Sequence, residues 1–218
     1  MSRPGAVVRI TAVGVSIAYA AALYLSDVKL DSGVKRVLAY LPSISGFLLT
    51  AFDLWLWRLA WVQKLLPRPR VDGLWAATLT PTEGSRIPDG GNRGPIEAYV
   101  CITQTYWSMS IRQYTAESTS DSCSVSLADR PDHQRFQLAY IYENQPRQEH
   151  IDRSPRHFGG SILDITGKIP REVVGFYFTD RYTKGDMHLR LVDRKSAQSS
   201  FEAAKDHSAS AAGGSPSP

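Results

Sequence analysis

Two long apolar runs open the chain, and alternating apolar and polar residues follow them. The runs cover residues 6–25 and 37–57. Each has about 20 residues, the length at which a helix crosses a hydrocarbon core ~30 Å thick. From residue 71 to 194, short alternating segments are separated by Pro, Gly, Asp and Asn, as is typical of β-strands. The pattern predicts a membrane α-hairpin of two transmembrane helices within residues 1–66, followed by an all-β domain at 71–194.

Eight segments of the second region have the two-residue period of strands. Eight strands of this length suit a compact antiparallel β-barrel, because closure leaves no exposed edge and the interior holds side chains or one small ligand. A β-sandwich is the alternative, since alternation does not distinguish one inner face from two. The predicted strands are residues 73–80, 96–105, 108–116, 122–128, 136–142, 160–166, 173–180 and 187–193.

The last segment, residues 195–218, is rich in Ser, Ala, Gly and Pro. Such a composition buries too little apolar surface to offset the entropy of the chain. We expect this tail to be disordered.

Two features of the apolar runs bear on helix packing. Gly14, Ala18 and Ala22 recur every four residues and form a stripe of small residues that permits close packing in a membrane, or they simply reflect an alanine-rich segment. Asp53 lies near the end of the second run, within a turn of Trp55 and Trp57. Its carboxylate either reaches the headgroups or bonds nearby water or Trp57, or it lines a helix–helix contact or a pore in an oligomer.

The distribution of basic residues predicts the topology. Cytoplasmic flanks of membrane spans carry an excess of Lys and Arg. Five basic residues flank the two ends, against three in the connection at 26–36, so both termini and the barrel are expected in the cytoplasm. A cleaved secretory signal is the alternative for the first run. The flanking residues are Arg3, Arg9, Lys64, Arg68 and Arg70, and those of the connection are Lys29, Lys35 and Arg36.

The net charge and the cysteine content exclude few kinds of ligand or site. The formal charge of +4 is compatible with an anionic ligand or a lipid surface. Cys101 and Cys123 fit no metal or redox spacing. They are expected to be free thiols, with a disulfide as the alternative, and we expect no metal site.

Polar residues continue the inward phase of several strands. Tyr140, Tyr142 and Asn144 follow Leu138 on one face of their strand. A second set, Tyr177, Thr179 and Arg181, shares a face of another strand, and Gln104 is in phase with Val100 and Ile102. If the apolar members point inward, these polar side chains also do, and we expect them at one end of the barrel. Stacking faces, hydrogen-bond donors and a cation suit a nucleotide. The alternative is a packed core whose tyrosine hydroxyls reach the rim.

Evidence for catalysis is weak. His150, Asp152 and His157 lie in one predicted loop, but neither a metal-binding spacing nor a Gly-x-Ser-x-Gly nucleophile motif accompanies them. We therefore expect a protein that is not an enzyme and needs no cofactor.

Several short motifs occur in a fixed order behind the two apolar runs. They are Asp72-Gly-Leu-Trp75, Ile102-Thr-Gln-Thr105, Leu138-Ala-Tyr-Ile-Tyr-Glu-Asn144, His157-Phe-Gly-Gly160, Gly175-Phe-Tyr-Phe-Thr-Asp-Arg181 and Thr183-Lys-Gly185. This order resembles the CD-NTase-associated protein 15 family, the two-transmembrane, β-strand-rich effectors of bacterial anti-phage (CBASS) signalling.

The resemblance implies a function and a set of ligand-binding residues. The barrel would bind a cyclic dinucleotide made by a partner CD-NTase. Binding would drive homo-oligomerisation, and the hairpins would then disrupt the bacterial inner membrane and kill the infected cell. A DNA or RNA polymer is not among the expected partners. The implied ligand-binding residues, taken with the inward phase above, are Gln104, Tyr140, Tyr142, Asn144, His157, Tyr177, Thr179, Arg181 and Lys184.

Two other functions remain open at this point. A membrane-anchored barrel could bind an apolar ligand, in which case its cavity should lack an inward arginine. It could also serve only to dock another protein, in which case its interior should be filled.

Overall fold

The computed structural model describes residues 4–25, 32–87, 89–130, 135–195 and 197–213. The chain forms two compact units, described separately below. The first contains residues 1–66 together with 105–108, and the second contains 67–104 together with 109–218.

The first unit is helical. Its helices are α1 (Pro4–Leu25), α2 (Ser32–Leu54), the 3₁₀ turn η1 (Leu56–Arg58) and α3 (Ala60–Leu65). None of the helices in the described part of the chain combines the length and apolar character required of a membrane span. Most of the connection between the two apolar runs, including Lys29, lies outside the described residues.

Helices α1 and α2 contact each other through small polar positions. The Ser16 hydroxyl donates to the carbonyl oxygens of Ala12 (2.7 Å) and Pro42 (2.7 Å), and Ser16 is buried. A Cβ added to Gly46 would lie 3.4 Å from Ser16 Oγ, so this glycine gives the hydroxyl its space. The predicted stripe of Gly14, Ala18 and Ala22 is exposed, so this intramolecular contact does not use it.

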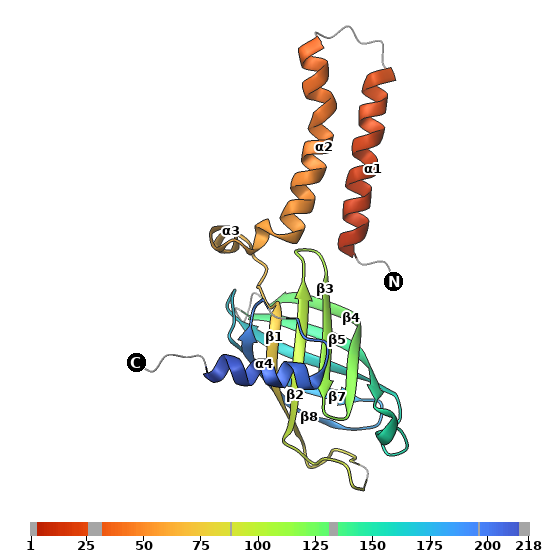
Figure 1. Ribbon diagram of the computed structural model, residues 1–218, viewed down its shortest axis with the longest axis vertical. Helices are drawn as coiled ribbons and strands as arrows, with labels where there is room; N and C mark the ends of the chain where they lie inside the picture. Colours follow the sequence, from red (N-terminus) through yellow and green to blue (C-terminus); the bar gives the residue numbers. More distant parts are fainter. Residues whose placement is uncertain (1–3, 26–31, 88, 131–134, 196, 214–218) are drawn as a thin grey trace, which may run out of the picture. The chain divides into compact units, whose positions relative to one another are not determined.

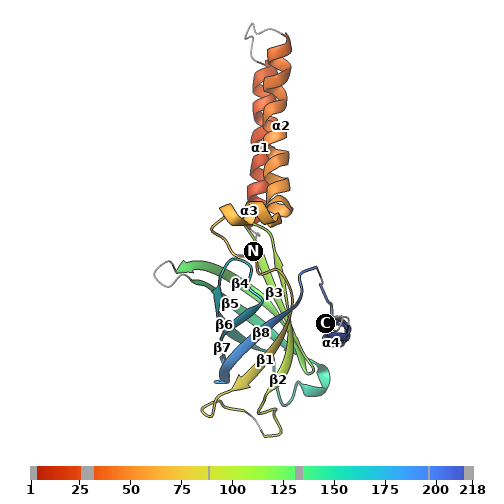
Figure 2. The ribbon, with the colours of Figure 1, turned by 90° about the vertical axis from the view of Figure 1, so that its left-hand side faces the viewer.

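The second unit is a closed barrel of eight antiparallel strands, each paired with its neighbours in sequence and β8 paired with β1 (Figures 1 and 2). The eight predicted strands and the antiparallel barrel are confirmed, and the sandwich alternative is wrong. The strands are β1 (Gly73–Pro81), β2 (Ile96–Gln104), β3 (Met109–Thr115), β4 (Ser118–Arg130), β5 (Arg135–Pro146), β6 (His157–Thr166), β7 (Glu172–Thr179) and β8 (Lys184–Asp193).

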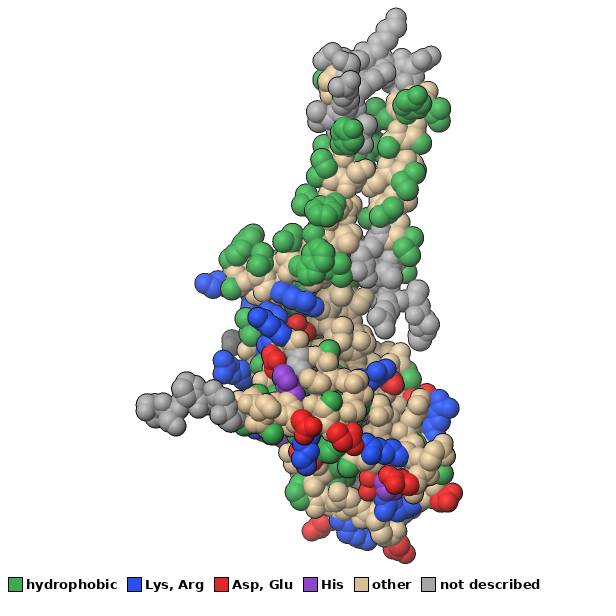
Figure 3. All heavy atoms as spheres, in the orientation of Figure 1, with side chains coloured by type: hydrophobic (Ala, Val, Ile, Leu, Met, Phe, Trp, Pro, Cys, Tyr) green, Lys and Arg blue, Asp and Glu red, His purple; other side chains and the backbone are tan. Residues whose placement is uncertain are grey.

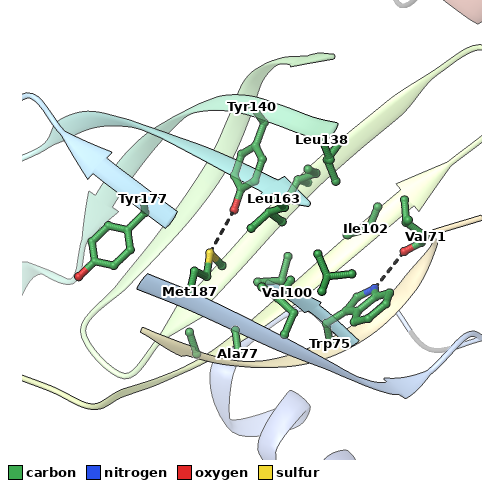
Figure 4. Close-up of a cluster of buried hydrophobic side chains, with 14 of the residues drawn as sticks. Val71, Trp75, Ala77, Val100, Ile102, Leu138, Tyr140, Leu163, Tyr177 and Met187 are labelled. Atoms are coloured by element: carbon green, nitrogen blue, oxygen red, sulfur yellow. Dashed lines mark hydrogen bonds between the residues drawn. The ribbon is translucent and has the colours of Figure 1, made fainter. Parts of the chain in front are cut away.

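Alternating side chains fill the barrel because successive residues of a strand point to opposite faces. Trp75, Val100, Leu138 and Leu163 are among the fully buried residues of this core (Figure 4). Their burial supplies the main apolar stabilisation of the barrel, about 1.5–3 kcal/mol for each large aliphatic side chain.

One end of the barrel is closed by hydrogen bonds to backbone. The Gln104 side chain accepts from Val71 N–H (2.8 Å) and donates to the Pro69 carbonyl (2.9 Å), and Trp75 Nε1–H donates to the Val71 carbonyl (2.9 Å; Figure 4). Arg194 donates to the Arg70 and Asp72 carbonyls at the same end (3.0 Å each). Each of these polar side chains is therefore engaged with backbone groups at this end.

The tail differs from its prediction of disorder. Phe201–Gly213 form helix α4, which packs on the outer surface of β2 and β8 (Figure 1). Ala204 is fully buried there, the Phe201 ring lies 5.5 Å from that of Tyr99, and Tyr114 OH donates to the Gln198 carbonyl (2.9 Å). The composition did not indicate this helix, because a few apolar residues are enough to hold a helix when the barrel offers an apolar face for them to pack against.

Candidate functional site

The other end of the barrel opens into a cavity of about 450 Å³. It lies where the odd-numbered strands β1, β5 and β7 end and the even-numbered strands β2, β6 and β8 begin. Of the nine predicted ligand-binding residues, six line it, and these are Tyr142, Asn144, His157, Tyr177, Thr179 and Arg181.

The tyrosines of β5 form a ladder along the inner wall. Tyr140 and Tyr142 are buried, with ring centroids 5.9 Å apart. Tyr140 lies deeper in the barrel than the residues that line the cavity. Its hydroxyl contacts Met187 Sδ at 3.9 Å (Figure 4). Burial raises the pKa of Tyr140 to about 12 and also raises that of Tyr142, so both hydroxyls are neutral donors at physiological pH.

Asn144 continues the ladder and offers an acceptor. Its Nδ2 donates to Ser118 Oγ (2.8 Å) and Ser120 Oγ (2.9 Å), which fixes the orientation of the amide. The Oδ1 atom is buried and has no hydrogen-bond partner among the described residues. A buried acceptor without a partner is unfavourable, so Oδ1 is suited to a donor brought by a ligand.

Arg181 supplies the positive charge of the cavity. Its Nη1 donates to Ser154 Oγ (3.0 Å) and its Nη2 lies 3.5 Å from His157 Nε2. The Nε atom is buried and has no partner in the described part of the chain. Burial lowers the pKa of Arg181, but the guanidinium stays charged. An arginine that is partly desolvated and incompletely bonded is suited to bind an anion.

His157 supports Arg181 as a neutral base. Burial, and then the charge of Arg181, lower the pKa of His157. Its Nδ1 lies 3.1 Å from the Pro155 carbonyl, which fits an Nδ1–H donor and leaves Nε2 as an acceptor toward Arg181. The histidine therefore orients the guanidinium without adding charge.

Strand β7 contributes the opposite wall. Tyr177 is buried and its side chain is drawn pointing away from the apolar core (Figure 4), and burial raises its pKa to about 12. Thr179 Oγ1 lies 2.5 Å from Thr183 Oγ1 and accepts from Thr183 N–H (3.2 Å), which closes the β7–β8 turn. Tyr177 thus presents its ring and hydroxyl to the cavity. Thr179 mainly stabilises the β7–β8 turn at the edge of the cavity.

Two predicted residues lie elsewhere. Gln104 points inward as predicted but lies at the closed end, because β2 runs antiparallel to β5 and β7 and so ends at the opposite end of the barrel. The expectation that all these polar residues meet at one end was wrong for Gln104. Lys184 is exposed on the outer surface, since Gly185 and Met187 take the inward phase of β8.

The structure adds cavity residues that the strand pattern did not indicate. Arg153, from the β5–β6 connection, lines the cavity and pairs with Glu117 (2.7 Å) while donating to the Gly90 carbonyl (3.0 Å). Gln113 of β3 also lines it. Strand alternation could not indicate Arg153, because this residue lies in a loop.

The cavity combines groups that can bind a small ligand. Two tyrosine rings, an amide acceptor and an arginine face one cavity, which suits a flat heterocycle attached to an anionic group. Within the described residues, no three His, Cys, Asp or Glu side chains are placed to hold a metal ion. Cys101 is buried and Cys123 is exposed, and both are free thiols.

Comparison with known proteins agrees with this chemistry. Residues 68–191 match the family model described as Cap15, cyclic dinucleotide receptor domain. No curated protein matches the chain.

Proposed function

The chain belongs to the Cap15 cyclic dinucleotide receptor domain family, and from this premise we propose that its barrel cavity binds a cyclic dinucleotide as the sensing step of a CBASS effector. The single observation that carries the proposal is the partly desolvated Arg181 beside two inward tyrosines. A cavity of about 450 Å³ lies within the ~300–1,000 Å³ typical of small-molecule sites.

Each group of the ligand has a proposed partner. Arg181, held by Ser154 and His157, binds a phosphate. The rings of Tyr142 and Tyr177 contact the bases, and Asn144 Oδ1 accepts from an exocyclic amine or a ribose hydroxyl. Tyr140, Thr179 and His157 position these groups. This assignment leaves the cavity without a catalytic role, and we propose a receptor rather than an enzyme.

The alternative of an apolar-ligand carrier is less favoured. An arginine with a buried, unpartnered Nε would be costly in a cavity built for an acyl chain. The alternative of a filled docking barrel is also less favoured, because the cavity accommodates a small molecule.

Calorimetric titration of cyclic dinucleotides into the detergent-solubilised full chain tests the binding proposal. We expect Arg181→Ala to weaken binding about 10- to 100-fold, since a hydrogen bond to a charged group contributes about 1.5–3 kcal/mol. Tyr142→Ala should weaken binding about 10-fold through loss of ring contact. Arg190→Ala, which alters an exposed arginine of β8, is the matched control. Unchanged affinity in both cavity variants would refute the assignment.

We further propose that the helical unit acts at the bacterial inner membrane, with both termini and the barrel in the cytoplasm. The support is the length of the two apolar runs and the large apolar side chains that α1 and α2 expose (Figure 3). Ile10 is 72% exposed and Phe47 is 68% exposed, which is costly in water but not among lipid tails. In this proposal a CD-NTase supplies the ligand, and ligand binding favours a homo-oligomer that disrupts the membrane.

A further inference from the structure

The outer surface of β5, β6 and β7 carries a continuous apolar face. Its large side chains are about half exposed, between 47% and 54%, although polar residues are usual on the solvent side of a strand. We name it the β6–β7 face. Its exposed members are Ile141, Phe158, Val174, Phe176 and Phe178.

The strand register makes these residues neighbours. Gly160 of β6 pairs with Ile141 on one side and with Phe178 on the other. In the next outward row, Ile162 pairs with Ala139 and with Phe176. The apolar surface therefore spans three strands without a charged residue in these two rows.

A glycine flattens the centre of this face. A Cβ added to Gly160 would lie 2.6 Å from Phe178 Cζ, so the Phe178 ring lies directly over Gly160. With the ring lying across β6 rather than standing upright, the face is suited to packing against another flat sheet ~10 Å away.

The size of the face fits a protein interface. Three phenylalanine rings and two aliphatic side chains, each about half exposed, present on the order of 500 Å² of apolar surface. Exposed apolar patches of ~300–600 Å² are the largest on typical monomers and are often functional. Two such faces would bury about 1,000 Å² before any polar rim is added, which approaches the size of a specific interface.

Side-chain size favours a second copy of this chain as the partner. A two-fold axis parallel to β6 would place β5 of one copy opposite β7 of the other. Phe176 would then meet the small Ala139, and Phe178 would meet Ile141. At the end of the face, Arg135 of β5 would lie opposite Glu172 of β7, and both side chains are exposed. Asp164 of β6 lies in the row of Val174 and would face its own copy across the axis, and Arg135, which pairs with it (4.0 Å), offsets that charge. Closer to the cavity, Glu143 is already neutralised by Arg156 (2.5 Å).

We propose that the β6–β7 face binds the same face of a second copy about this two-fold axis. The inference names the surface for the self-association in the proposed function, and it rests on that function. Helix α4 covers a different part of the barrel, on β2 and β8, so it leaves this face open.

Sedimentation velocity of the detergent-solubilised full chain, over a concentration series with and without cyclic dinucleotide, tests the proposal. We expect Phe176→Glu combined with Phe178→Glu to weaken self-association about 30-fold or more, as expected for loss of central aromatic contacts. Ile169→Glu, which changes an exposed residue in the β6–β7 connection, is the matched control and should leave association unchanged.

A charge exchange identifies the partner as a second copy. Arg135→Glu alone should weaken association about 5-fold, because it places two glutamates opposite each other and removes the cation paired with Asp164. Adding Glu172→Arg in the same chain should restore part of the association. Calorimetry on every variant separates the two proposals. Wild-type chain that binds ligand but stays monomeric, or associates equally well with both phenylalanines replaced, overturns this interface. Wild-type chain that binds no cyclic dinucleotide overturns the proposed function instead.

Discussion

At the scale of single residues, the position of Tyr142 depends on a glycine of the neighbouring strand. Gly159 pairs with Tyr142 in the β5–β6 register. A Cβ added to Gly159 would lie 2.4 Å from Cζ and from the hydroxyl oxygen of Tyr142. A larger residue at position 159 would clash with the ring. The glycine therefore lets the Tyr142 ring lie across β6 at the wall of the cavity.

Gly159→Ala should displace the Tyr142 ring. We expect the free energy of unfolding to fall by about 1–3 kcal/mol, the usual cost of overpacking a buried site, and ligand affinity to fall about 10-fold. Denaturant unfolding and calorimetric titration measure the two effects. Gly84→Ala is the matched control, because its added methyl group would meet only the flexible Lys184 side chain at 3.5 Å. Wild-type affinity in Gly159→Ala would show that the ring position does not matter for binding.

At the scale of elements, α4 lies beyond the family match at 68–191 and yet packs on the barrel. Glu202 of α4 pairs with Arg147 (2.5 Å), just after β5, and Lys205 pairs with Glu97 (3.1 Å) on β2. These ion pairs are exposed and contribute little, so the buried contacts of Phe201 and Ala204 hold the helix. Phe201 and Lys205 also border the cavity, which places the start of α4 beside the proposed ligand.

Ala204→Glu should detach α4 from the barrel. A carboxylate at this fully buried position would be crowded and would lose its hydration, so we expect a loss of about 2–4 kcal/mol in stability. Hydrogen exchange should rise in β2 and β3, where Tyr99 and Tyr114 lose their cover. Ala211→Glu makes the same change at an exposed position of the helix and should have little effect. Equal exchange in the two variants would mean that α4 does not protect this face.

At the scale of the whole molecule, the chain connects the helical unit to the barrel in more than one place. The first link follows Leu66, and the β2–β3 connection at 105–108 belongs to the helical unit although both of its strands belong to the barrel. Within the helical unit, Asp53 Oδ1 accepts from Trp107 N–H (3.1 Å) and its carbonyl accepts from Tyr106 N–H (3.1 Å). Phe52 adds a ring contact with Tyr106, at 4.9 Å between centroids. Asp53 thus organises the turn at 105–108 within the helical unit.

Expression in bacteria, with and without a cyclic-dinucleotide synthase, tests the coupled function. We expect membrane permeability to rise only when both proteins are present, and to be lost when residues 4–65 are deleted. Asp53→Ala should reduce permeability severalfold, because it leaves the Trp107 N–H without this acceptor, and calorimetry should show unchanged ligand affinity. Ser45→Ala removes only an exposed hydroxyl of α2 and is the matched control. Permeability that does not depend on the synthase would contradict ligand gating.

The sequence by itself determined the strands and the inward or outward direction of their side chains. Alternation along β5 correctly predicted that Tyr140, Tyr142 and Asn144 point inward, because it follows from local backbone geometry. The same rule applied to β8 already directs Met187 inward and Lys184 outward, so Lys184 was misplaced by motif resemblance rather than by periodicity.

Only the tertiary structure decided where each residue lies along the barrel axis and which outer faces of the barrel are covered. Gln104 and Tyr142 both point inward but lie at opposite ends of the barrel. The position of a residue along the barrel axis depends on the direction of its strand and on its register with neighbouring strands. Arg153 reaches the cavity through a loop, and α4 covers β2 and β8 while the β6–β7 face stays open. These features depend on contacts between residues far apart in the chain, which a local pattern of apolar and polar positions does not encode.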